Sequence, residues 1–166
     1  MTIIDELRRL ALFVVLSLTQ VLVFNHIHLF GYATVLLVVY FVVMIPRNYP
    51  RWALLLWSFF LGLFVDLFSN TPGMAAASLT LTAFLQPYLL YLFEPREAPE
   101  NMRSAAASMG FDKFAPYAFI LVFIYTTVFL TIEAFTFFNW LEWCLKIVGS
   151  TLLTFMLLLA LETIRK

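Results

Sequence analysis

Residues 59–80, FFLGLFVDLFSNTPGMAAASLT, place an aspartate inside a strongly apolar stretch of the chain. Asp66 lies four residues after Gly62. The turn that follows is formed by residues with high turn propensity, namely Asn70, Thr71, Pro72 and Gly73. A carboxylate at the centre of a membrane helix costs about 2.5 to 3.5 kcal/mol on insertion scales. We therefore expect the chain to supply hydrogen bonds or nearby water to Asp66.

The composition of the whole chain predicts a membrane protein. Of its 166 residues, 63% are hydrophobic, 18% are aromatic and only 12% are charged. A water-soluble globule of this size cannot hide so much apolar surface, whereas a bundle of membrane-spanning helices can expose it to lipid. The sequence therefore predicts an all-α membrane protein with one domain, residues 1–166.

Apolar runs separated by turn-forming sequences predict six membrane helices, because a span needs roughly 17 to 25 mainly apolar residues. The expected spans are residues 7–24, 27–45 or its part 32–45, 52–68, 74–93, 115–138 and 143–161. The start of the chain has no signal-peptide cleavage pattern, so we expect the first span to be retained. Residues 101–109 have the composition of a short surface helix.

The positions of the basic residues predict the orientation in the membrane, since Lys and Arg concentrate in cytoplasmic loops. Nine of the ten basic residues fall at the two termini or in the loops after the second and fourth spans: Arg8, Arg9, Arg47, Arg51, Arg96, Arg103, Lys113, Arg165 and Lys166. We therefore expect both termini on the cytoplasmic side, with very short outer loops.

Two carboxylates, Asp66 and Glu133, are expected inside spans at similar depth in the outer half of the bilayer. A functional interpretation makes them a proton or cation site. A structural interpretation, which we favour, makes each an acceptor for helix N-terminal amides, hydroxyls or water. Lys146 is the best basic partner for a buried ion pair with either carboxylate.

Other candidate residues have simpler interpretations. Gln86 precedes Pro87 in the fourth span and is expected to hydrogen-bond inside the bundle. The small residues around Ala76 permit close approach of another helix, more readily within this chain than from a partner. His26 and His28 lack further ligands for a metal site, and Cys144 is interpreted as a packing residue. We find no catalytic motif, no cofactor motif and no basic patch suited to nucleic acid.

The segment LGLFVDLFSNTPGMAAASLTLTAFLQP resembles the signature of the bacterial rod shape-determining MreD family. In that family a glycine, an aspartate four residues later and a T-P-G-like turn mark the end of one membrane helix and the start of the next. The matching positions here are Gly62, Asp66, Thr71, Pro72, Gly73 and Ala76.

The resemblance implies a non-enzymatic scaffold of the inner membrane that takes part in cell elongation. The implied partners are the single-span protein MreC, the glycosyltransferase RodA with its transpeptidase and, through them, the cytoplasmic MreB filament. The fold of the family is similar to that of the six-helix substrate-binding subunits of energy-coupling-factor transporters.

That similarity supplies an alternative of a different class, a small-molecule-binding transporter subunit. A vitamin-like ligand would need a cavity with convergent polar groups, for which Asp66, Asn70, Glu133 and His26 are the candidates. An ion channel or exporter is weaker, because only two carboxylates are placed to line a path.

Overall fold

The computed structural model describes residues 3–23, 28–29, 33–94, 109–135 and 139–165. Its helices and strands are, in chain order, α1 (Ile3–Leu22), β1 (His28–Leu29), β2 (Ala33–Thr34), α2 (Val39–Val43), α3 (Arg51–Ser69), α4 (Met74–Phe93), α6 (Phe111–Ala134) and α7 (Trp140–Arg165). The protein is thus almost entirely helical in these ranges. The surface helix expected at 101–109 lies outside the described residues, except for its last residue.

Within the described ranges, four helices are long and apolar enough to cross a membrane: α3, α4, α6 and α7. Helix α4 has the bounds that the sequence predicts, and α3 exceeds its predicted span by one residue at each end. Helix α1 has 20 residues, but its first two turns contain Asp5, Glu6, Arg8 and Arg9. The charges explain why α1 is not among the four helices that meet both the length and the composition of a span.

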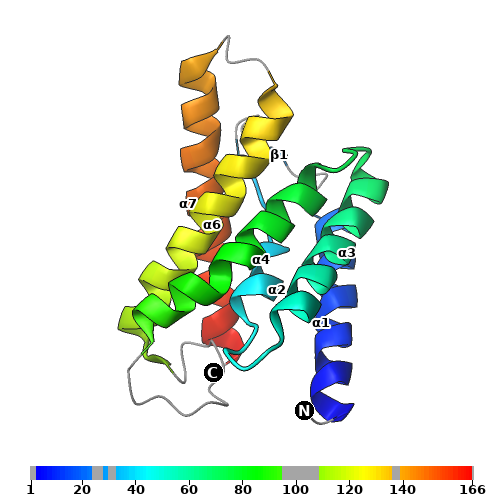
Figure 1. Cartoon of the computed structure of the whole chain (residues 1–166). Helices are drawn as coiled ribbons and strands as arrows, with labels where there is room; N and C mark the ends of the chain where they lie inside the picture. Colours follow the sequence, from blue (N-terminus) through cyan, green and yellow to red (C-terminus); the bar gives the residue numbers. More distant parts are fainter. Residues whose placement is uncertain (1–2, 24–27, 30–32, 95–108, 136–138, 166) are drawn as a thin grey trace.

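The long helices form a layered bundle around α2. Helix α3 packs against α4, α4 against α6, and α6 against α7, while α1 packs on α3. Both chain termini lie at the same end of the bundle, and α2 lies among the long helices (Figure 1). The α3–α4 turn, the end of α6 and the start of α7 lie at the opposite end from the termini (Figure 1).

The expected second span is not a membrane-length helix. Residues 28–34 contribute the two-residue strands β1 and β2, which pair antiparallel, and only the five residues of α2 are helical after them. The run from Thr34 to Ile45 is rich in β-branched residues, which restrict side-chain rotation in helices, and Pro46 follows it. Apolarity alone predicted a helix here, and that prediction was wrong because the segment is packed inside the protein.

All residues of the segment 35–45, which we call the central segment, are buried. Non-helical backbone is tolerated at membrane depth only where protein or water covers it, because lipid offers no hydrogen bonds. Here side chains of the surrounding helices provide them. The side chain of Gln20 on α1 donates to the Val35 carbonyl at 2.8 Å and accepts from the Leu37 amide at 2.8 Å.

Helices on the other side of the central segment complete its hydrogen bonding. The Leu36 amide donates to Thr154 Oγ1 on α7 at 3.2 Å. The Tyr40 hydroxyl donates to Glu162 Oε2, also on α7, at 3.1 Å. At the other end, Gln86 Nε2 on α4 donates to the Ile45 carbonyl at 3.2 Å. Three helices that are distant in sequence are therefore bound to one buried strip of backbone.

We predict that Gln20→Leu destabilises the protein by about 3 kcal/mol, because it leaves a buried amide and a buried carbonyl of the central segment unpaired. The measurement is equilibrium unfolding in detergent. Leu18→Ala, at an exposed position of the same helix, is the matched control and should cost less than about 1 kcal/mol. Equal losses for the two variants would contradict the role assigned to Gln20.

Candidate functional site

The carboxylate of Asp66, near the end of α3, binds the first turn of α4. Oδ1 accepts hydrogen bonds from the Ala75 amide and from the Thr71 hydroxyl, both at 2.9 Å. Oδ2 accepts from the Ala76 amide at 2.9 Å. Asp66 is only 3% exposed, so these three donors replace the water that the carboxylate gives up. The helix N-terminus also carries partial positive charge, which favours an anion.

Asp66 does for α4 what an N-cap side chain normally does. The N-cap position is Gly73, which has no side chain to accept from the first amides. The Met74 amide donates to the Thr71 carbonyl at 3.3 Å, and the next two amides bind Asp66. The Ala77 amide donates to the Gly73 carbonyl at 3.0 Å and begins the regular helix. Every amide of the first turn is thus satisfied, as a buried helix end requires.

The backbone of Asp66 holds the other half of the turn. Its carbonyl accepts from the amides of Asn70 and Thr71, the latter at 3.2 Å. Asn70 ends α3 in the left-handed conformation, with φ of 57°, which asparagine tolerates better than most residues. Pro72 is exposed in the turn. One residue therefore closes α3 with its backbone and opens α4 with its side chain.

Gly62 allows the two helices to come this close. A Cβ added to Gly62 would lie 2.6 Å from the Ala76 nitrogen and 2.7 Å from the Ala75 carbonyl carbon, and in contact with the Ala76 Cα. All three are backbone atoms, so no side chain can move aside. Gly62 and Asp66 are four residues apart and share one face of α3. The pair therefore faces the same two residues of α4, one by close packing and the other by hydrogen bonding.

The remaining predicted residues lie elsewhere. Gln86 is buried in α4, three turns beyond Ala76, where it also donates to the Tyr117 hydroxyl of α6 at 3.0 Å. Glu133 is the next-to-last residue of α6 and is exposed, because α6 ends at Ala134. Glu133 therefore lies in the last turn of the helix that forms the fifth predicted span rather than well inside it. His26 lies outside the described residues.

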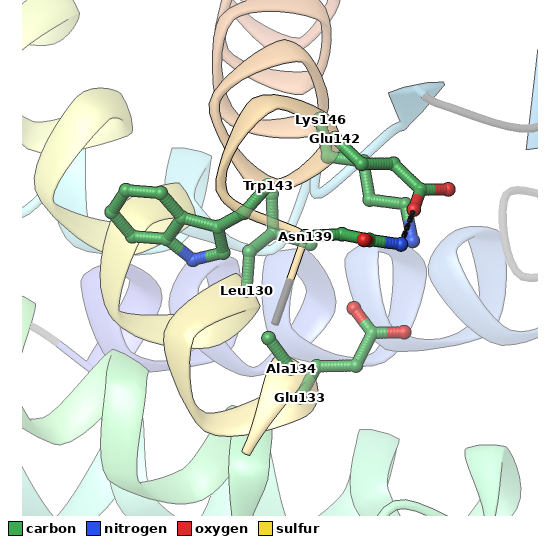
Figure 2. Close-up of a pocket in the computed structure, with 7 residues that line it drawn as sticks. All are labelled: Leu130, Glu133, Ala134, Asn139, Glu142, Trp143 and Lys146. Atoms are coloured by element: carbon green, nitrogen blue, oxygen red, sulfur yellow. Dashed lines mark hydrogen bonds between the residues drawn. The ribbon is translucent and has the colours of Figure 1, made fainter. Parts of the chain in front are cut away.

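Glu133 lines a cleft of about 310 Å³ between the ends of α6 and α7. The lining residues are Leu130, Glu133, Ala134, Asn139, Glu142, Trp143 and Lys146 (Figure 2). Asn139 Nδ2 donates to Glu142 Oε2 at 3.1 Å. The expected ion pair of Lys146 with Asp66 or Glu133 is not found among the described residues. Asp66 uses its oxygens for α4, and Glu133 shares the cleft with Lys146 without direct pairing.

Sequence reasoning missed the polar residues that bind the central segment. Gln20, Thr154 and Glu162 each lie in or next to an apolar run, and all three are buried. A polar side chain in a predicted span was the available signal, since such residues usually face the protein interior. The pattern did not show that these side chains bind the backbone of the central segment. If the second span were a helix, its amides and carbonyls would already be paired with one another.

The arrangement around Asp66 is suited to holding two helices together rather than to reacting with a ligand. Its oxygens face donors from the same chain. Among the described residues, no group of three or more His, Cys, Asp or Glu side chains could hold a metal ion. Comparisons of the chain with protein-family models, with curated proteins and with solved structures found no match.

We predict that Asp66→Ala lowers the free energy of unfolding by about 3 kcal/mol or more, because two buried amides and a hydroxyl lose their acceptor. Asp66→Asn should lose less, since it keeps one of the two oxygens. Unfolding in detergent would measure both. Asp112→Ala, at an exposed aspartate in the first turn of α6, should change stability by less than about 1 kcal/mol. An Asp66→Ala protein as stable as this control would contradict the capping role.

We predict that Gly62→Ala destabilises the protein by about 2 to 3 kcal/mol through overpacking against the α4 backbone. Gly73→Ala is the informative comparison, because Gly73 has φ of 83° but nothing within 4 Å of an added Cβ. Its expected cost is only backbone strain of about 1 kcal/mol. A larger loss at Gly73 than at Gly62, measured by thermal unfolding, would show that turn conformation outweighs helix packing.

Proposed function

We propose that the chain is a non-enzymatic scaffold of the bacterial inner membrane that acts in cell elongation, as its resemblance to the MreD family implies. The observation that supports this most directly is the contact of Gly62 and Asp66 on α3 with Ala75 and Ala76 on α4, which we call the Asp66 joint. The residues that carry the resemblance, Gly62, Asp66 and the turn after them, serve to fix two helices rigidly. A motif with that role is typical of a protein whose shape, rather than whose chemistry, matters to its partners.

The proposed topology has both termini in the cytoplasm. At the end of the bundle where the termini lie (Figure 1), Arg8, Arg9 and Arg165 line a small cleft together with Asp5. Arg47 at this end pairs with Glu94 at 3.0 Å. Basic residues favour the cytoplasmic face. In this proposal α1 and the central segment complete the six crossings, α1 as a helix and the central segment covered by protein.

The proposed partner is an MreC-like protein, which in turn would bring the RodA-type glycosyltransferase, its transpeptidase and the MreB filament. The small-residue face around Ala76 is occupied by Gly62 of the same chain. A partner helix would therefore use aromatic faces. A groove of about 710 Å³ between α1 and α3 offers one, with Phe13, Trp57 and Phe60 in its lining.

The alternative function, a transporter subunit that binds a small molecule, receives less support. The side chains expected to bind the small molecule were predicted to converge on one cavity. Asp66 is instead hydrogen-bonded to α4, and Asn70 ends α3 at the surface. Neither lines the cleft that contains Glu133. A pocket for a vitamin-like molecule needs several polar groups aimed at one volume. We therefore propose the scaffold.

Affinity purification of the tagged chain from gently solubilised bacterial membranes, followed by mass spectrometry, tests the proposal. We predict recovery of an MreC-like protein together with the two cell-wall synthases. Leu56→Trp, which fills the α1–α3 groove, should reduce that recovery by about fivefold or more, since one bulky residue at a packed interface costs about 1 kcal/mol or more.

The matched control is Leu67→Trp, an exposed position on the same helix outside the groove, which should leave recovery unchanged. Recovery of two ATPase subunits and a coupling membrane protein instead would replace the scaffold by the transporter subunit. Recovery of the expected partners in equal amounts with both tryptophan variants would keep the scaffold and exclude the groove.

A further inference from the structure

The cleft between α6 and α7 contains charges of both signs at the end of the bundle opposite the termini. The side chains of Glu133 from α6, of Asn139 just before α7, and of Glu142 and Lys146 from α7 lie on one side of the cleft. Trp143 lies on the other (Figure 2). These residues take no part in the Asp66 joint or in binding the central segment. Their arrangement therefore needs an explanation of its own.

Lys146 has no ion-pair partner within the part of the chain that the structure describes. A lysine within a membrane-spanning helix normally finds an anion or reaches the interface. Both carboxylates of the cleft are near enough to line the same volume, but neither is within 4 Å of its amine. The cleft thus holds a cation and two anions that are separated by space.

The residues that carry the charges come from both helices. Glu133 is at the end of α6 and Glu142 is in the first turn of α7. Lys146 follows Glu142 by four residues and so shares its face of α7. In Figure 2 the amine of Lys146 extends toward Asn139 and the Glu142 carboxylate, so a cation and two anions line one small volume.

We propose that this cleft binds a phosphoethanolamine headgroup, with the primary ammonium at Glu133 and Glu142 and the phosphate at Lys146. A phosphoethanolamine headgroup carries one anion and one cation, so it offers a partner both to Lys146 and to the two carboxylates. Leu145, Val148 and Leu152 are exposed on α7 and offer an apolar surface to acyl chains.

The chemistry distinguishes this headgroup from related ones. A primary ammonium donates hydrogen bonds to carboxylates, and such charge-assisted bonds are strong. A choline headgroup has no N–H, and its usual recognition by a cage of aromatic rings is not matched by Trp143 alone. A phosphatidylglycerol headgroup has no cation for Glu133 and Glu142. Of these three headgroups, phosphoethanolamine is therefore the one that satisfies both kinds of charge in the cleft.

The proposal is tested by native mass spectrometry of the purified chain with phosphatidylethanolamine, phosphatidylcholine and phosphatidylglycerol of identical acyl chains. The expected result is about tenfold tighter binding of phosphatidylethanolamine than of either other lipid, the effect of one charge-assisted hydrogen bond. Lys146→Gln and Glu142→Gln should each reduce this preference to about twofold or less. Lys113→Gln and Asp112→Asn, exposed at the other end of α6, should preserve it.

A second arm identifies the source of the headgroup. Soluble glycerophosphoethanolamine that competes with the lipid, and fails to compete in Lys146→Gln, would show that the headgroup alone is recognised. Lipid binding without competition would show that the acyl chains are required as well. Equal binding of the three lipids, or a preference that survives both cleft variants while their melting temperatures match the unsubstituted chain, would overturn the proposal.

Discussion

The need to satisfy backbone hydrogen bonds away from water governs this structure. Most of the chain meets it by forming helices, in which each amide finds a carbonyl of the same segment. The central segment, residues 35–45, does not, because only Val39–Val43 is helical. It is acceptable at the centre of a membrane bundle only because Gln20, Gln86 and Thr154 supply donors and acceptors to its backbone. The positions of α1, α4 and α7 are therefore coupled through the central segment.

The Asp66 joint solves the same problem at a helix end. A tight turn between two membrane helices leaves the first amides of the second helix unpaired. Gly73 is needed for its positive φ and so cannot provide a capping side chain. Asp66 reaches across from α3 instead, and Gly62 keeps the backbones close enough for it to do so. The hydrogen bonds from the first amides of α4 offset the cost of burying the carboxylate, and the carboxylate in turn satisfies those amides. The buried aspartate and the uncapped helix end therefore occur together.

The structure around a residue can be predicted from the sequence when the residue's hydrogen-bond partners are close to it in the chain. Asp66, Thr71 and Ala76 are within ten residues of one another, so their role as acceptor and donors followed from the turn signal and was found. The bounds of α4 followed from its flanking turn and its apolar length. The central segment could not be predicted in this way. Its apolar run has the length of a span, and its conformation depends on partners such as Thr154, 118 residues away from Leu36.

The contacts of the polar side chains indicate where other molecules can bind to the bundle. Inside the bundle, Asp66, Gln20 and Gln86 are engaged in holding the chain together. A residue used in this way cannot also bind a ligand without loosening the fold. Charged side chains are found at the two ends, in the cleft with Arg8, Arg9 and Arg165 near the termini and in the α6–α7 cleft. Between the ends, the surface is formed by exposed apolar and aromatic side chains. The proposed lipid binding therefore depends on one end of the bundle, and the proposed binding of a membrane partner depends on the shape of its aromatic flanks.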